Sequence, residues 1–266
     1  MDSITILGSR GSVPRAGAEY LKYGGNTSCI LVSLAGETIL LDAGTGLMEL
    51  DCSSAGIGSK VSLLLSHAHA DHLLGLPLCS LLMDPDGRLD IYLRSRGGLS
   101  PSEQLERYVS PPLWPVRLEQ LPARVSIREL PASFSIGDVQ VETMEGIHPG
   151  GVTLLKLSGT GHSLVYVSDS TLTPALLPAL TDFARGCDLL LCDGQYTEEE
   201  FHARPNFGHS SWRMAADLGV RCGAKQIRIV HHDPHHTDAL LDAAAPVLRV
   251  IHPGAAFAMD KEEIIL

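Results

Sequence analysis

The sequence has little positive charge, few aromatic residues and no long apolar run. Of its 266 residues, 20 are Lys or Arg and 31 are Asp or Glu, which gives a formal net charge of -11. Binding to extended phosphate backbones draws on clustered positive charge, so this balance disfavours a large nucleic-acid footprint. The longest apolar run, residues 73–83, contains Gly75 and Pro77 and is shorter than the ~20 residues that span a bilayer. We therefore expect neither an extended nucleic-acid partner nor a membrane partner.

Signals for secretion and for disulfide formation are also missing. Met1 is followed by Asp2 and a strand-like run, without the basic start and apolar stretch of a signal peptide, so a cytoplasmic location is expected. The six cysteines form no CxxC pair, and several lie in apolar strand patterns. Buried reduced thiols are therefore expected, rather than disulfides or thiolate metal ligands.

Histidine is abundant by contrast. The chain has 12 His but only five Lys, and a surplus of imidazole in an acidic chain points to metal binding. The composition, 44% hydrophobic and 19% charged, is typical of a compact soluble protein and excludes disordered, collagen-like and coiled-coil chains.

Apolar periodicity predicts a layered α/β fold. Twelve short runs read as strands: 4–7, 28–32, 38–42, 61–65, 90–93, 125–129, 139–144, 152–157, 164–168, 188–192, 226–230 and 255–259. Four segments show helical periodicity: 71–83, 174–185, 211–222 and 237–248. No linker, charge block or internal repeat divides the chain, so we expect one domain over residues 1–266. The proline-rich stretch 94–122, with a short candidate helix near 102–108, is either a lid or an ordinary surface excursion.

The sequence His67-Ala68-His69-Ala70-Asp71-His72 places four candidate metal ligands within six residues, directly after a predicted strand. Neutral imidazole and carboxylate suit zinc and similar ions, and a strand-to-helix turn can direct such side chains to two nearby points. A chance gathering of these groups beside a buried strand would leave polar atoms without partners, which costs free energy.

Three more candidate ligands follow predicted strands later in the chain. His148, Asp169 and His231 each stand where an apolar strand ends. Strand ends of this kind gather at one edge of a sheet in α/β proteins. Each residue alone is more often an ordinary loop residue, but together with the first cluster they favour a dinuclear metal site.

In its motifs the chain resembles the metallo-β-lactamase superfamily, through HAHADH at 67–72 followed by His148, Asp169 and His231 in the order typical of that family. Further motifs resemble the branch that contains ribonuclease Z and the cyclic-nucleotide and phosphonate-pathway phosphodiesterases: GSRGSVP at 8–14, GGNTSC at 24–29, LLDAGTGL at 40–47, HPGG at 148–151, DGQYTEEE at 193–200, GHSSW at 208–212 and HHDP at 231–234. The resemblance covers nearly the whole chain.

This resemblance implies a four-layer αβ/βα sandwich and two divalent ions. One ion would be held by His67, His69 and His148, the other by Asp71, His72 and His231, with Asp169 bridging. His232 competes with His231 for the last position, and the register of Pro234 and Asp238 favours His231. Asp42 would orient the metal loop through hydrogen bonds to the ligands. Zinc is the expected metal, with manganese or iron as alternatives.

The expected reaction is hydrolysis by a metal-activated hydroxide, oriented by Asp169 with a contribution from Asp71. His209 in GHSSW resembles the histidine that ribonuclease Z places beside the scissile phosphate, and Asp193 falls where that branch keeps an acidic partner. A carboxylate that accepts a hydrogen bond from imidazole favours its acid form, so His209 is the candidate general acid. The alternative is a histidine that only supports the helix start. Ser210 and Ser211 are interpreted as helix N-caps rather than nucleophiles.

Arg204, Arg213 and Asn26 are the candidate substrate-binding residues. Each arginine could clamp a phosphate oxygen or be a solvated surface residue, and Asn26 could donate to substrate or fix its turn.

The predicted function is that of a dinuclear phosphodiesterase acting on a small phosphodiester, such as a cyclic nucleotide, a cyclic phosphate or a short oligonucleotide. Ribonuclease Z holds tRNA with a basic glycine- and proline-rich arm, and residues 94–122 are too short and too mixed in charge to match it. Hydrolysis of a lactone, thioester or β-lactam is the first alternative, and a metal-stabilised binding module the second. A homodimer is possible, because the branch often forms dimers.

Overall fold

The protein folds into two seven-stranded β-sheets, as described by a computed structural model for residues 2–50 and 60–266. The first sheet has the strand order β14-β1-β2-β3-β4-β5-β6, with bounds Glu262–Ile265, Ser3–Gly8, Cys29–Leu34, Glu37–Leu41, Lys60–Leu64, Arg88–Leu93 and Arg124–Glu129. The second has the order β13-β12-β11-β10-β9-β8-β7, with bounds Ala255–Phe257, Gln226–Val230, Leu189–Asp193, His162–Val167, Thr153–Gly159, Val139–Glu145 and Ser133–Ile136.

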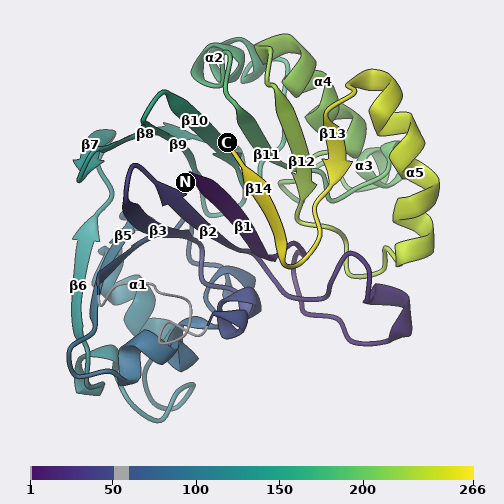
Figure 1. The fold of residues 1–266 in the computed structure, drawn as a ribbon. Helices are drawn as coiled ribbons and strands as arrows, with labels where there is room; N and C mark the ends of the chain where they lie inside the picture. Colours follow the sequence, from purple (N-terminus) through teal and green to yellow (C-terminus); the bar gives the residue numbers. More distant parts are fainter. Residues whose placement is uncertain (1, 51–59) are drawn as a thin grey trace.

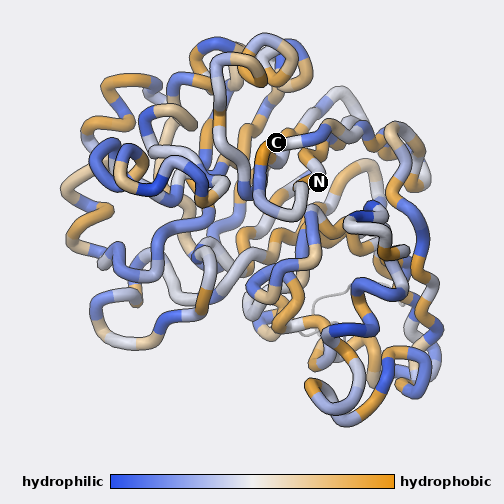
Figure 2. The backbone as a smooth tube through the Cα atoms, turned by 180° about the vertical axis from the view of Figure 1, so that it is seen from behind, coloured by the Kyte–Doolittle hydropathy of each residue, from blue (hydrophilic) through white to orange (hydrophobic). Residues whose placement is uncertain are grey.

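Helices cover the outer faces of both sheets. The α-helices are α1 (Pro101–Tyr108), α2 (Leu177–Phe183), α3 (Glu198–Ala203), α4 (Trp212–Cys222) and α5 (Asp238–Ile251). Short 3-10 helices span Ala18–Tyr20, Thr45–Glu49, Ala70–His72, Leu76–Leu78, Ser80–Met83 and Leu118–Gln120. Figure 1 shows the sheets lying against each other, with α2, α4 and α5 on one outer side and α1 on the other. Hydrophobic and hydrophilic residues alternate along these helical turns (Figure 2), as expected for helices that cover a sheet with one face.

Three apolar clusters hold the layers together. One lies between the sheets and joins residues such as Ile30 and Leu41 of the first sheet to Leu155 and Tyr166 of the second. Another packs the outer face of the first sheet against the 3-10 helices and α1, and the last packs the second sheet against α2, α4 and α5. Burying apolar area in three such clusters is the main favourable term in folding. The predicted four-layer αβ/βα sandwich is confirmed.

The sheet topology brings several strand ends to one edge. In the first sheet β3, β4 and β5 run parallel, and in the second β10, β11 and β12 run parallel. The carboxyl ends of parallel strands meet at the same sheet edge, which is where α/β proteins place their sites. Asp42, Asp169 and His231 each follow one of these strands within two residues.

The predicted helix over 71–83 is wrong. This segment forms three short 3-10 helices instead, Ala70–His72, Leu76–Leu78 and Ser80–Met83. Gly75 and Pro77 explain the difference, because Pro77 lacks an N–H for an α-helical bond and Gly75 packs against the chain at Gly44. A Cβ on Gly75 would lie 2.2 Å from the Gly44 carbonyl oxygen.

The other predicted elements are present, with altered ends. All twelve predicted strands are observed, whereas β7, β14 and α3 were not predicted. Ser211 caps α4 by accepting a hydrogen bond from the Met214 N–H, as predicted, but Ser210 instead donates to the Ser170 carbonyl.

Five cysteines are free and buried, as predicted, while Cys52 lies outside the described residues. Across residues 2–50 and 60–266, no helix is long and apolar enough to span a bilayer.

Candidate metal centre

Asp42 organises the turn that carries the HAHADH sequence. Its side chain is fully buried and accepts hydrogen bonds from the Ser66 N–H (2.7 Å) and the Ser66 hydroxyl (2.9 Å). His72 Nδ1 lies 2.8 Å from Asp42 Oδ2, and the Tyr166 hydroxyl donates to the same oxygen at 2.9 Å. Asp42 thus hydrogen-bonds to one candidate ligand, His72, and to Ser66, the residue before another candidate ligand. Because Nδ1 of His72 is engaged here, its Nε2 is directed into the site.

The first group of candidate ligands consists of His67, His69, His148 and Asp169. One donor atom from each lies within 4.8 Å of all the others. Nε2 of His148 is 3.1 Å from Nδ1 of His69, and Oδ2 of Asp169 is 3.7 Å from Nε2 of His67. His67 and His69 come from the end of the first sheet, while His148 and Asp169 come from the second.

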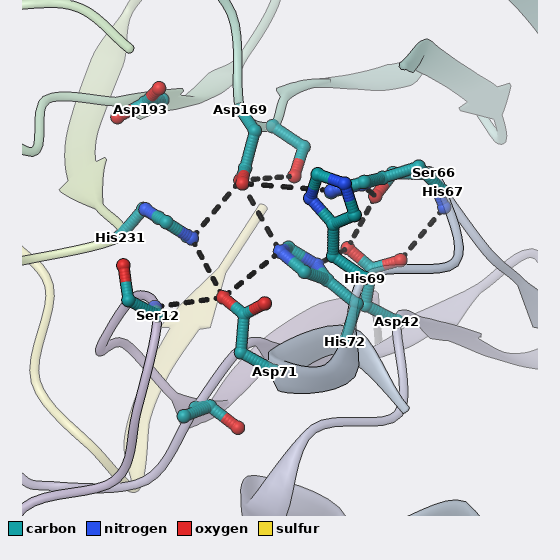
Figure 3. Close-up of polar contacts among 12 residues, drawn as sticks. Ser12, Asp42, Ser66, His67, His69, Asp71, His72, Asp169, Asp193 and His231 are labelled. Carbon is teal, nitrogen blue, oxygen red and sulfur yellow. Dashed lines mark hydrogen bonds and ion pairs between the residues drawn. The ribbon is translucent and has the colours of Figure 1, made fainter. Parts of the chain in front are cut away.

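The second group consists of Asp71, His72, Asp169 and His231, and all four are buried. Nε2 of His231 is 3.1 Å from Oδ2 of Asp71 and 3.1 Å from Oδ1 of Asp169. Nε2 of His72 is 3.3 Å from the same Asp169 oxygen. Figure 3 shows Asp169 and Asp71 pointing toward each other, with His231 and His72 on either side. Asp169 thus presents Oδ1 to this group and Oδ2 to the first, so its carboxylate could serve cations in both groups.

His231, and not His232, has its ring in this cluster. The His232 ring faces the other way, where its Nε2 hydrogen-bonds to the Ala258 carbonyl at 2.9 Å and its edge contacts Tyr23 and Phe257. The geometry thus brings His231 to the other candidate ligands and directs the His232 ring away from them, and the role of His231 as a ligand stays a prediction.

The donor set and its unpaired atoms fit divalent cations. Nε2 of His67 and Nε2 of His72 are buried and make no hydrogen bond in the described part of the chain, although buried polar atoms normally make one. Their nearest carboxylate oxygens lie at the longer ion-pair distances of 3.7 Å for His67 and 3.3 Å for His72. Burial lowers the pKa of His67 well below its ordinary value, so this imidazole is neutral, the form that binds metals. Burial would raise the pKa of Asp71, but His72 and His231 outweigh it and lower that pKa. Burial disfavours a charge on His72 and His231, but Asp71 and Asp169 outweigh it and raise both pKa values, that of His231 to about 9, so a cation bound by this group would displace protons. Imidazole and carboxylate are the ligands that zinc and related ions accept.

His209 lies beside both groups. Its ring stacks on His231 at 4.9 Å and contacts the His148 ring edge at 5.1 Å. Nδ1 of His209 is 3.0 Å from Oδ2 of Asp193, a fully buried carboxylate that also accepts the Ser170 and Gln195 N–H groups. The Asp193 carboxylate fixes the tautomer and orientation of the His209 ring. Nε2 is left as the atom that can exchange a proton with a ligand.

The three predicted substrate-binding residues lie in different surroundings. Arg204 lies over the Tyr196 ring, 5.2 Å from its centroid, and that ring contacts His209. Arg213 is exposed and lines a hollow of about 320 Å³ against α5, and none of the candidate metal ligands lines that hollow. The Asn26 side chain is engaged with Glu49 and Thr45, which fits its turn-fixing interpretation. Of the three, only Arg204 approaches the site.

The segment 94–122 begins beside the connection between β8 and β9, which carries His148. The Arg96 guanidinium hydrogen-bonds to Glu145 and to the Thr153 hydroxyl (2.9 Å). It also lies against Gly151, where a Cβ would come within 2.1 Å of Nη1. The predicted short helix is present as α1. These contacts attach the start of the segment to the β8–β9 connection that carries His148, and a lid function stays a prediction.

Backbone groups complete the site, and sequence reasoning missed them. The Ser12 N–H donates to Oδ2 of Asp71 at 2.8 Å, and the Gly208 carbonyl hydrogen-bonds to Nδ1 of His148 at 2.9 Å. Gly208 has φ +87, and a Cβ there would lie 2.3 Å from Nδ1 of His148. A backbone donor or acceptor carries no side-chain signature, so only the GSRGSVP and GHSSW motifs pointed to these loops.

Comparisons with known proteins place this geometry in a family. The family model described as "Beta-lactamase superfamily domain" matches residues 37–232. Ribonuclease Z of Bradyrhizobium sp. (strain ORS 278) is 25% identical over 316 aligned positions, which include 99% of each chain. Since this chain has 266 residues, that alignment contains at least 50 positions at which the relative has a residue and this chain has none.

Two solved structures have the same fold over nearly their full lengths. The metallo-beta-lactamase fold protein YhfI from Bacillus subtilis superposes with a TM-score of 0.75 and 18% identity, covering 99% of this chain and 98% of that chain. A structure described as a new diphosphatase from the PhnP family gives a TM-score of 0.73 and 20% identity, covering 100% and 98%. The chain belongs to the metallo-β-lactamase superfamily and is similar in sequence to ribonuclease Z.

Proposed function

We propose that this protein is a dinuclear metal-dependent phosphodiesterase whose substrate is a small phosphodiester. The observation that carries the proposal is the position of the Asp193–His209 pair, with the His209 ring in contact with one histidine of each ligand group. Cleaving a phosphodiester at neutral pH requires a proton for the departing alkoxide, and His209 is the proton donor best placed for it.

The roles of the residues follow from the two ligand groups. His67, His69, His148 and Asp169 would hold one cation, and Asp71, His72, Asp169 and His231 the other. Divalent ions, when bound, supply Lewis-acid polarisation of a phosphoryl oxygen and acidify a coordinated water. Asp169 faces both groups and orients the attacking water, with Asp71 accepting a further hydrogen bond. His209 delivers the proton to the leaving oxygen, and Asp193 keeps its ring in place.

Two observations support a small substrate. The net charge of -11 leaves little positive surface for a long phosphate backbone. The chain also lacks at least 50 residues that the Bradyrhizobium ribonuclease Z has in the alignment. The name of that relative favours RNA as the second candidate substrate, so a structured precursor RNA belongs among the substrates to be tested.

The test begins with elemental analysis of the purified protein, for which we expect two equivalents of zinc. The holoenzyme is then assayed on cyclic nucleotides, dinucleotides, bis(p-nitrophenyl) phosphate, a structured precursor RNA, and a panel of lactone, thioester and β-lactam substrates. We expect turnover of at least one small phosphodiester, and slower turnover of the RNA and of the acyl panel. Faster cleavage of the RNA would overturn the substrate class. Turnover of the acyl panel alone would overturn the reaction, and a fully metallated protein that cleaves nothing would indicate a binding module.

A further inference from the structure

His231 has a backbone conformation that its surroundings must hold in place. Its φ of +62 is in the left-handed region, where residues with a side chain are disfavoured. Such a residue persists only when neighbouring contacts determine its conformation, and it is often found at functional sites. The contacts that determine the conformation of His231 also determine where its Nε2 points.

The segment 9–11 supplies those contacts. The Gly11 N–H donates to the His232 carbonyl at 3.0 Å, and the His232 N–H donates to the Ser9 carbonyl at 3.1 Å. Gly11 also packs directly against the His231 ring, because a Cβ at Gly11 would lie 2.2 Å from Nδ1. The segment 9–11 thus hydrogen-bonds to the backbone of His232 and packs against the ring of His231.

Arg10, in the middle of the segment, is fully buried. Its Nη1 donates to the Asp233 carbonyl (3.1 Å) and to the His236 carbonyl (2.8 Å), while Nη2 donates to the Gly24 carbonyl (2.7 Å). Within the described residues, no carboxylate hydrogen-bonds to Arg10. Its guanidinium N–H groups bind backbone carbonyl groups instead. A lysine has a single donor nitrogen and cannot reproduce this pattern.

The same segment also reaches the other side of the second ligand group. Ser12, two residues after Arg10, donates its N–H to Oδ2 of Asp71 at 2.8 Å. In contrast, the Nδ1 atoms of His67 and His148 are oriented by Ser66 and Gly208, far from Arg10 in the sequence.

We propose that Arg10 is a positioning residue for the second ligand group, and that it sets the affinity of that group for a divalent cation without setting the affinity of the first. This inference rests on the metal centre within the proposed function. It does not depend on the substrate or on the reaction catalysed.

The experiment titrates Zn²⁺ into the chelator-stripped protein by calorimetry, with a competing chelator to bring tight binding into range. We expect two binding events in the unmodified protein, and His69→Ala identifies the event of the first group by weakening it. Arg10→Met should weaken the other event by about 10–100-fold, the usual effect of losing a group that orients a ligand. Arg10→Lys should give a smaller loss.

Arg228→Lys is the matched control. Arg228 is on β12, three residues before His231, and also donates to backbone carbonyls, those of Ile227 and Gly254. We expect this variant to keep both events. Gly11→Ala, which places a Cβ against His231, tests the same group if Arg10→Met does not fold. Equal weakening of both events in the Arg10 variants, or no weakening in a folded variant, would overturn the proposal. Absence of phosphodiesterase activity would leave it standing.

Discussion

His209→Ala should slow the cleavage of phosphodiesters that have poor leaving groups, while leaving the metal content unchanged. The substitution removes the proposed proton donor, and among the described residues the His209 side chain hydrogen-bonds to Asp193 rather than to one of the proposed ligands. Nδ1 of His148 is held by the Gly208 carbonyl, and Asp71 by the Ser12 N–H. The ring of His209 contacts those of His148, His231 and Tyr196. A loss of proton donation, measured as the rate of cleavage, can therefore be distinguished from a loss of bound metal in this variant.

The expected magnitude follows from what a positioned acid contributes. General acid catalysis is worth about 10²–10⁴-fold, or roughly 2.7–5.4 kcal/mol of barrier. We expect the upper part of this range for an alkoxide leaving group, because His209 is 8% exposed and fixed by Asp193 at 3.0 Å. The p-nitrophenolate leaving group departs without a proton, so bis(p-nitrophenyl) phosphate should lose much less. Asp193→Asn keeps the side-chain size and should show a smaller loss with the same dependence on leaving group.

The assay compares kcat and kcat/KM on a dinucleotide or cyclic nucleotide and on bis(p-nitrophenyl) phosphate, with elemental analysis and thermal melting of each variant. His202→Ala is the matched control, since His202 is exposed on α3 and hydrogen-bonds to the Glu198 carbonyl. It should behave as the unmodified protein. Equal losses on both kinds of substrate, or loss of metal from His209→Ala, would refute the assignment of His209 as leaving-group acid.

Four further predictions concern the site and its surroundings. Asp42→Asn should weaken cation binding by about 10–100-fold in a calorimetric titration, because Asp42 orients the ligand turn, and an unchanged affinity would contradict that role. Gly208→Ala places a Cβ 2.3 Å from Nδ1 of His148, so it should weaken the first ligand group more than the second in the same titration. Arg213→Ala should leave kcat/KM unchanged while Arg204→Ala lowers it, and equal effects would show that the hollow against α5 takes part in binding. Chelation should lower the Tm, since free metal at 100 times its Kd stabilises by about 2.7 kcal/mol, and a Tm that does not respond to metal would contradict a folded-state site.

Much of the fold could be predicted from local patterns. Strands such as β4 (KVSLL) and β12 (QIRIV) have mostly apolar buried positions and are followed by polar residues, so both the strand and the position of His67 or His231 follow from the sequence. In residues 71–83 the apolar spacing resembles that of a helix, but Pro77 prevents the α-helical bonding. The edge strand β14 was missed because two of its four residues are glutamates.

The parts of the site that could not be predicted are those that depend on long-range packing. From the sequence alone, Arg10 resembles an ordinary surface cation. Its burial depends on the packing of residue 10 against residues 24 and 233–236, which are distant in the sequence. The Ser12 N–H and the Gly208 carbonyl belong to the backbone, so no residue type marks them. Arg213 had the right chemistry for a phosphate clamp, but its place on the outer side of α4 directs it away from the ligands.

The way the ligands are divided between the sheets links the metal centre to the stability of the whole fold. Each group takes two ligands from the end of the first sheet and two from the end of the second, and Asp169 belongs to both groups. Without cations, the two sheet ends are joined at this point by hydrogen bonds, among them that from the Tyr166 hydroxyl to Asp42 and that between Nε2 of His231 and Oδ2 of Asp71. Cations held by both sheets would add cross-links at this edge, and none of their proposed ligands belongs to the apolar cluster between the sheets. Removal of the cations should therefore loosen the sheet ends before it affects that cluster. Hydrogen exchange should then increase first after β4, β10 and β12 on chelation, and uniform loss of protection across both sheets would contradict this division.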